Sequence, residues 1–359
     1  MNTLSTILQK KISSWSSVKD IVGKIGTETC EIEGVQGSLA GFIVTEYIHT
    51  VKKDIAIVVP TLKELQDICT DIQTCDDSIE ILVLPWWGTV PYRAAAKGSI
   101  IFGERAAVLA KLCCHSEHPR VFIMQQRAFQ TPVPNPEYEK KLVFSVRKGM
   151  DFDPIKLSEM LTEHGYTRVP RVTVRGEFTL RGEVLDIFMP GEEYAHRIVF
   201  DFDTISHIKS FNPETQSTDK SFDELIIYPM KEVIWTDEMV HELESALQPL
   251  FSLVVGQNET GSVLVADEEK FQERCDTLLT ELYANHETES EELLYPLVFD
   301  RLYTVLDYID EDTPLLFLTT TVLIMHRKVL TANIWDCTEK SVLSDLFQPL
   351  RKSLYLLIR

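Results

Sequence analysis

Five consecutive apolar residues, Ile55–Val59, end at Pro60 and restrict the fold of this chain more than any other stretch. An uninterrupted run of this kind is typical of a parallel strand that is buried on both faces. Helical spacing of apolar residues follows the proline directly, at Leu62, Leu65, Ile68 and Ile72. The stretch therefore predicts a buried strand followed by a helix that covers the sheet.

The same alternation continues through the first third of the chain. Further strands are expected at residues 30–33, 79–84 and 121–124, and a helix at 104–112. Alternating strands and helices indicate an α/β domain with a mainly parallel sheet. We assign its first part to residues 1–124.

The pattern changes near residue 125, where Pro132, Pro134 and Pro136 indicate a linker. A helix is expected to begin at Asp153-Pro154 and to end at Gly165. After it come only strands, a pair within 175–190 that is broken at Arg181-Gly182 and others at 197–202, 205–211 and 225–228. One helix followed by strands predicts a small inserted α+β domain at 125–234.

Residues 235–359 return to helices and to strands at 262–266 and 314–319, which predicts a second part of the α/β layer. The acids between 267 and 292 indicate a solvated helix face. The closing apolar run 353–358 favours a piece of a longer polypeptide.

Charge and cysteine usage restrict the class of protein. The chain has 359 residues and a formal net charge of -20, which argues against a duplex-DNA clamp over the whole surface. Its seven cysteines are scattered without a CxxC pair, as in a reduced cytosolic protein. No signal peptide and no apolar run of about 20 residues is present, so we expect a cytoplasmic protein without a membrane partner.

Two clusters contain side chains of the kinds that bind metal ions, but an interpretation without a metal ion is favoured for both. Cys113-Cys114-His115, with His118 nearby, has no partner cluster and is expected to be a helix end with buried thiols. Asp201 and Asp203 flank Phe202 and would share one face of a strand, where an exposed acidic face is the better interpretation. We therefore expect no metal site.

Four arginines gather near the predicted strand pair of an otherwise acidic chain. Arg168, Arg171, Arg175 and Arg181 are accompanied only by Glu177 among acids in residues 165–181. A local arginine-rich strand surface on an acidic protein is typical of a docking site.

A strand, a glycine loop and a helix in residues 30–40 have the order of a phosphate loop. The loop carries Gly34, Gly37 and Ser38 but lacks the lysine that neutralises phosphates, and no Lys or Arg occurs between Lys24 and Lys52. We expect neither nucleotide binding nor ATP hydrolysis here, and a plain strand-to-helix turn has the same consequence. The sequence contains no HExxH, GxSxG or CxxC motif, so no catalytic residues are assigned.

Together these stretches resemble the N-terminal module of the bacterial transcription-repair coupling factors, which is itself similar to the excision-repair helicase UvrB. The resemblance is carried by residues 34–38, 84–92, 104–105, 197–202 and 295–299, and most specifically by Gly176-Glu177-Phe178 through Phe188. It covers most of the chain in order. Two departures from UvrB, the missing lysine and a missing tyrosine-rich hairpin after Tyr92, favour the coupling factors.

The resemblance implies a degenerate P-loop NTPase (helicase-like) parallel-sheet domain with an inserted UvrA-binding domain. Such a module recruits UvrA to stalled RNA polymerase in nucleotide excision repair. ATP with Mg²⁺, double-stranded DNA and RNA polymerase would be bound by other parts of the full protein, so no cofactor is expected here.

For the contact with UvrA we expect Arg168, Arg171, Arg175 and Arg181, with Phe178 as a possible apolar anchor. The alternative is that some arginines pair internally and that Phe178 belongs to the core. Rival functions are a UvrB-like ATP-dependent helicase subunit, a DNA-binding protein that uses the arginines on phosphates, and a metal-dependent enzyme that uses Asp201 and Asp203.

Overall fold

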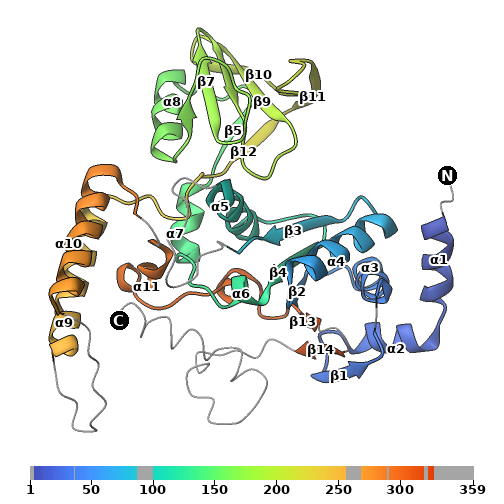
Figure 1. The fold of residues 1–359 in the computed structure, drawn as a ribbon. Helices are drawn as coiled ribbons and strands as arrows, with labels where there is room; N and C mark the ends of the chain where they lie inside the picture. Colours follow the sequence, from blue (N-terminus) through green and yellow to red (C-terminus); the bar gives the residue numbers. More distant parts are fainter. Residues whose placement is uncertain are drawn as a thin grey trace. The chain divides into compact units, whose positions relative to one another are not determined.

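The computed structural model describes residues 4–35, 37–86, 100–255, 268–288, 291–318 and 322–326 (Figure 1). The chain divides into two compact units, each drawn from separated stretches of sequence. Within the described residues, unit 1 comprises 4–35, 37–86, 115–131, 305–318 and 322–326, and unit 2 comprises 100–114, 132–255, 268–288 and 291–304.

Unit 1 contains a six-stranded sheet in the order β1-β14-β13-β2-β4-β3. Strands β13, β2, β4 and β3 are parallel, whereas β14 pairs antiparallel with both β13 and the edge strand β1. This confirms the predicted α/β class with a mainly parallel sheet. The bounds of the strands are β1 (Cys30–Glu33), β2 (Ile55–Val59), β3 (Glu80–Leu84), β4 (Arg120–Gln125), β13 (Leu315–Leu318) and β14 (Val322–His326).

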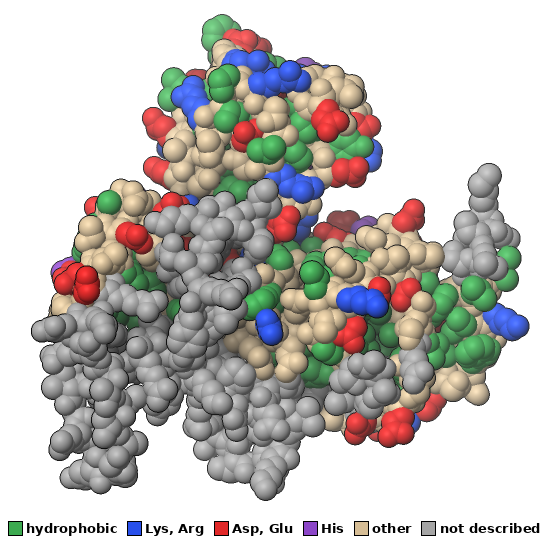
Figure 2. Space-filling view, viewed as in Figure 1, with side chains coloured by type: hydrophobic (Ala, Val, Ile, Leu, Met, Phe, Trp, Pro, Cys, Tyr) green, Lys and Arg blue, Asp and Glu red, His purple; other side chains and the backbone are tan. Residues whose placement is uncertain are grey.

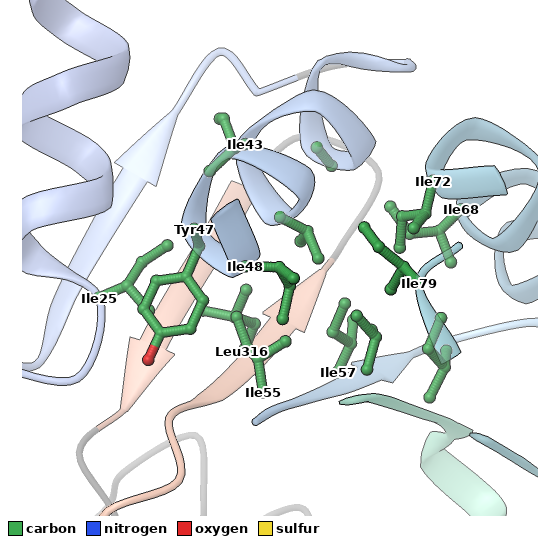
Figure 3. Close-up of a cluster of buried hydrophobic side chains, with 14 of the residues drawn as sticks. Ile25, Ile43, Tyr47, Ile48, Ile55, Ile57, Ile68, Ile72, Ile79 and Leu316 are labelled. Atoms are coloured by element: carbon green, nitrogen blue, oxygen red, sulfur yellow. The ribbon is translucent and has the colours of Figure 1, made fainter. Parts of the chain in front are cut away.

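Both faces of this sheet are covered, as the apolar run of β2 predicts. Ile55 and Ile57 belong to a core that they share with the helices on one face, and Figure 3 shows their side chains directed toward Tyr47 and Ile48 of α3. On the other face, the ring of Phe317 meets the ring of Phe129 edge to face at 5.8 Å. The helices of unit 1 are α1 (Leu4–Ser13), α2 (Ser16–Lys24), α3 (Leu39–Val51), α4 (Leu62–Cys75), α6 (Gln126–Phe129) and the 3₁₀ helix η2 (Val305–Tyr308).

The sheet that carries the candidate site lies in unit 2, in the order β11-β10-β9-β8-β7-β6. Helix α8 (Pro154–Glu163) packs against one face of it, where Leu157 and Leu161 join a core of strand residues. The Asp153 carboxylate accepts a hydrogen bond from the Ile155 N–H and so caps this helix as predicted. The strands are β6 (Thr167–Arg168), β7 (Glu177–Arg181), β8 (Val184–Ile187), β9 (Ala195–Asp201), β10 (Thr204–Phe211) and β11 (Thr218–Phe222).

The remainder of unit 2 is mostly helical and has a core of its own. Arg105 of α5 donates to Glu232 at 2.5 Å, and both side chains are fully buried. A two-stranded sheet pairs β5 (Phe144–Arg147) with β12 (Glu224–Ile227). The helices are α5 (Ile100–Cys113), α7 (Pro136–Leu142), α9 (Asp237–Val255), α10 (Glu268–Asn285), α11 (Tyr295–Val298) and the 3₁₀ helix η1 (Glu291–Leu293).

Some local expectations differ from the structure. The proline passage is not simply a linker, because Asn135 caps helix α7 and Pro136 is its first residue. The solvated-face interpretation of 267–292 is wrong at its end, where Glu291 and Glu292 are buried. The edge strands β6 and β11 were not predicted from the sequence, because β6 has two residues and β11 is almost wholly exposed. The strand expected at 262–266 and the closing run 353–358 lie outside the described residues.

Candidate functional site

The predicted strand pair forms an antiparallel hairpin, β7–β8, that closes at Gly182 with φ +59°. A positive φ is the reason for glycine at this turn. Alternation places Phe178 and Leu180 on the core face of the sheet and Thr179 and Arg181 on the opposite face, which we call the outer face.

Phe178 is fully buried in the core beside Leu161 and Ile187, with 0% of its surface exposed. The hypothesis that Phe178 is a surface anchor is therefore wrong, and the alternative assignment to the core is correct. The physical reason is the register of β7, which directs this ring toward α8.

A buried carboxylate organises the arginines of the outer face. Asp186 of β8, with a side chain only 2% exposed, accepts hydrogen bonds from Arg197 Nε at 2.6 Å and Arg197 Nη2 at 2.8 Å. Its Oδ2 also accepts a long hydrogen bond of 3.5 Å from Arg181, whose side chain remains 56% exposed. A bidentate pair of this kind fixes the orientation of a guanidinium group.

Arg197 is held from a second side as well. Its guanidinium lies over the Phe211 ring, 4.6 Å from the centroid, and Nη2 donates to Gln216 Oε1 at 3.3 Å. The hydrogen bonds to Asp186 raise the pKa of Arg197 above its usual range despite the opposing effect of burial. Register places Lys209 of β10 beside Arg197 on the same face. We call Arg181, Arg197 and Lys209, with Asp186 among them, the cationic face.

The other predicted arginines are exposed as well. Arg171 donates to the Glu214 carbonyl at 3.4 Å, and Arg175 donates to the Glu192 carbonyl at 2.8 Å. Arg168 pairs in parallel register with Phe178, so it lies at the sheet edge on the side away from the cationic face. Figure 2 shows Lys and Arg side chains interspersed with acids over the strands β7–β11.

Glu177, the acid nearest these arginines in sequence, forms hydrogen bonds with the backbone of the preceding loop. Its carboxylate accepts hydrogen bonds from the N–H groups of Thr173 at 2.8 Å and Val174 at 2.9 Å. Burial raises the pKa of Glu177, but these hydrogen bonds outweigh it and lower the pKa below its usual range. Glu177 therefore shapes the loop before β7.

The candidate phosphate loop lies in unit 1, where Gly34 and Gly37 have φ of +84° and +55°. Ser38 donates its hydroxyl hydrogen to Asp71 Oδ1 of α4 at 2.7 Å. Helix α4 can approach because α3 has Gly41 at the contact, where an added Cβ would lie 2.5 Å from the Asp71 Cβ. The loop thus faces a carboxylate rather than a lysine; Gln36 lies outside the described residues.

The two candidate metal clusters are not supported within the part of the chain that the structure describes. Asp201 ends β9 and Asp203 lies in the hairpin turn with Phe202, so the expectation that they share one strand face is wrong. Burial raises the pKa of the Cys113 thiol to about 12, as expected for an inert thiol at a helix end. Among the described residues, no helix is long and apolar enough to cross a membrane.

Sequence reasoning missed three members of the cationic face, Asp186, Arg197 and Lys209. The sequence does indicate which of these residues share a face. Asp186 lies two residues after Val184 and Arg197 lies two residues before Val199, which is the spacing of residues on one face of a strand. The pairing of β8 with β9 that joins Asp186 to Arg197 is visible only in the structure.

Comparison with known proteins identifies the class of this domain. Residues 144–233 match the family model described as the UvrB interaction domain. The protein is thus an α/β protein with an inserted UvrB interaction domain, and the matched interval falls within the segment 125–234 assigned from the sequence.

Individual relatives extend the match beyond this domain. The transcription-repair-coupling factor of Borreliella burgdorferi is 28% identical over 288 residues, which is 79% of this chain and 23% of the relative. That of Rickettsia conorii is 26% identical over 274 residues, 75% of this chain and 22% of the relative. The UvrABC system protein B of Kosmotoga olearia is 32% identical over 192 residues, 51% of this chain and 28% of the relative. The chain is homologous to the N-terminal region of the transcription-repair-coupling factors, as its motifs predict, and spans less than a quarter of their length.

Proposed function

We propose that this chain is a non-catalytic interaction module of transcription-coupled nucleotide excision repair that docks UvrA and brings it to RNA polymerase stalled at damage. The observation that carries the proposal is the cationic face organised by Asp186, because it lies on the domain that matches the UvrB interaction domain. RNA polymerase and double-stranded DNA would be contacted by parts of the longer coupling factors, and the setting would be the cytoplasm.

The chemistry of the face supports a protein partner with exposed carboxylates. Arg181 keeps more than half of its side chain exposed, whereas Arg197 is already oriented by Asp186 and Phe211. Guanidinium groups pair bidentately with carboxylates, and holding one in place beforehand lowers the entropy lost on binding. Half-buried Val184 and Val199, paired across β8 and β9, add apolar area beside the arginines. The face therefore combines charge with a small apolar area.

We propose further that no nucleotide is bound by this chain. A triphosphate at the Gly34–Ser38 turn would meet the Asp71 carboxylate on Ser38 and no lysine. A UvrB-like ATP-dependent subunit is the alternative function, favoured by the match to UvrABC system protein B over half of this chain. Titration with Mg-ATP separates the two, since the UvrB-like function requires a rise in thermal stability and our proposal requires no change.

Calorimetric titration of the 359-residue chain with purified UvrA tests the docking proposal. We expect saturable binding that weakens as salt is raised, because the arginines contribute through charge. Titration with duplex DNA is the control and should give far weaker binding, given the net charge of -20. Tight binding of DNA without binding of UvrA would overturn the proposal.

A further inference from the structure

The β9–β10 hairpin has an unusual residue at its turn. Asp201 pairs with Thr204, which leaves Phe202 and Asp203 as a two-residue loop. Phe202 has φ +56° and is 82% exposed. Tight turns place Gly, Asn or Asp at positions with positive φ, and a bulky residue there is strained.

Neither the left-handed backbone conformation of Phe202 nor the solvent exposure of its ring stabilises the isolated fold. The left-handed backbone costs free energy for any residue with a Cβ, and a ring in water gains nothing from burial. Strain of this kind at an exposed turn is a reason to look for a function.

Phe202 lies at the end of the sheet where Arg181 is found. The Phe200 N–H donates to the Glu183 carbonyl at 2.8 Å, so the turns of the β7–β8 and β9–β10 hairpins are neighbours. Across the outer face, Arg181 pairs with Val184, Val184 pairs with Val199, and Val199 pairs with His207. Phe202 lies in the turn three residues after Val199, so it is found at the same end of the sheet as Arg181.

We propose that Phe202 is the apolar anchor of the partner contact whose charged part is the cationic face. The inference rests on the proposed function, since it assigns the same partner, UvrA. An exposed aromatic ring at the same end of the sheet as an exposed arginine is a combination found in binding hot spots.

The surroundings of Phe202 define the chemistry of the partner surface. Asp201 and Asp203 flank the ring and are exposed. The apolar pocket that takes the ring must therefore be rimmed by cations or N–H donors, whereas the area opposite Arg181 must carry carboxylates. This arrangement of charge also fixes one orientation of the partner on the sheet.

The test compares Phe202→Gly with wild type in calorimetric titration of the 359-residue chain with UvrA. Glycine tolerates the positive φ, so the variant should melt at a higher temperature than wild type and yet bind at least about tenfold more weakly. Phe202→Leu should retain most of the affinity because it keeps an apolar side chain. Leu62→Ala, which removes an exposed apolar side chain from α4 in unit 1, is the matched control and should bind as wild type does.

Binding measured at different salt concentrations distinguishes the role of Phe202 from the docking function on which this inference rests. The loss in Phe202→Gly should persist from about 0.1 M to about 0.5 M salt, whereas the loss in Arg181→Ala should shrink, because salt screens charge and not apolar contact. Weak binding by Arg181→Ala with wild-type binding by Phe202→Gly would overturn the anchor and leave the docking function intact. No binding of UvrA by the wild-type chain would overturn both.

Discussion

Asp186 and Arg197 lie opposite each other on β8 and β9, and the carboxylate of Asp186 accepts two hydrogen bonds from the Arg197 guanidinium. The same carboxylate contacts Arg181 from the neighbouring strand. One buried acid thus holds two cations of an outward sheet face, which links the stability of the domain to the geometry of the proposed docking surface.

Replacing Asp186 should affect stability and binding together. Asp186→Ala leaves the half-buried Arg197 without its carboxylate, so we expect a loss of about 2 kcal/mol in the free energy of unfolding. UvrA affinity should fall as well, because Arg181 and Arg197 lose their orientation. Urea denaturation and calorimetric titration measure the two effects, with Asp219→Ala on the exposed strand β11 as control. Unchanged stability of Asp186→Ala would contradict the organising role.

Arg181→Ala should weaken UvrA binding by about 1–3 kcal/mol without unfolding the domain, since this side chain is exposed and its hydrogen bond to Asp186 is long. Arg168→Ala should have a smaller effect, because register places Arg168 away from the cationic face. Arg147→Ala, which removes an exposed arginine paired with Glu224, is the matched control. Equal affinities of Arg181→Ala and Arg147→Ala in calorimetry would remove Arg181 from the contact.

Phe178→Ala should act on folding rather than on recognition. The ring is fully buried among Leu161, Leu185 and Ile187, so its loss leaves a cavity in the core. We expect a decrease of about 3–5 kcal/mol in the free energy of unfolding, measured by urea denaturation. A variant that stays as stable as wild type and loses only UvrA binding would restore Phe178 as an anchor.

Stability should fall as pH rises because of a buried acid in the helical part of unit 2. Burial, with Glu292 and Glu232 nearby, raises the pKa of Glu291 from 4.5 to about 8, although Lys231 opposes the shift. The folded state therefore binds a proton that the unfolded state releases, so stability decreases between pH 4.5 and about 8. Trp235 Nε1 and the Tyr295 hydroxyl both donate to Glu291 in the folded protein.

Glu291→Gln checks this expectation, because the amide keeps an acceptor oxygen and cannot ionise. Urea denaturation at pH 5 and pH 8 should show a flatter pH dependence for the variant than for wild type, and greater stability than wild type at pH 8. Glu242→Gln, an exposed acid on α9, should leave the wild-type pH dependence in place. Parallel profiles for Glu291→Gln and wild type would show that Glu291 ionises normally.

Local sequence patterns predicted much of the architecture. The run Ile55–Val59 was enough to predict a strand buried on both faces, since only a sheet with two covered faces accommodates five apolar residues in succession. Gly182 and the alternation around it predicted the β7–β8 hairpin, and the motifs from Gly176 to Phe188 predicted the family. These features depend on neighbouring residues, so the sequence determined them by itself.

The tertiary structure decided which side chains act together. Long-range pairing of β8 with β9 brings Asp186 to Arg197, and parallel pairing of β6 with β7 separates Arg168 from Arg181. The packing of α8 buries Phe178, whereas the turn between β9 and β10 leaves Phe202 in solvent. Alternation shows that two residues of a strand face opposite ways, but only the packed sheet determines which of the two faces is the core.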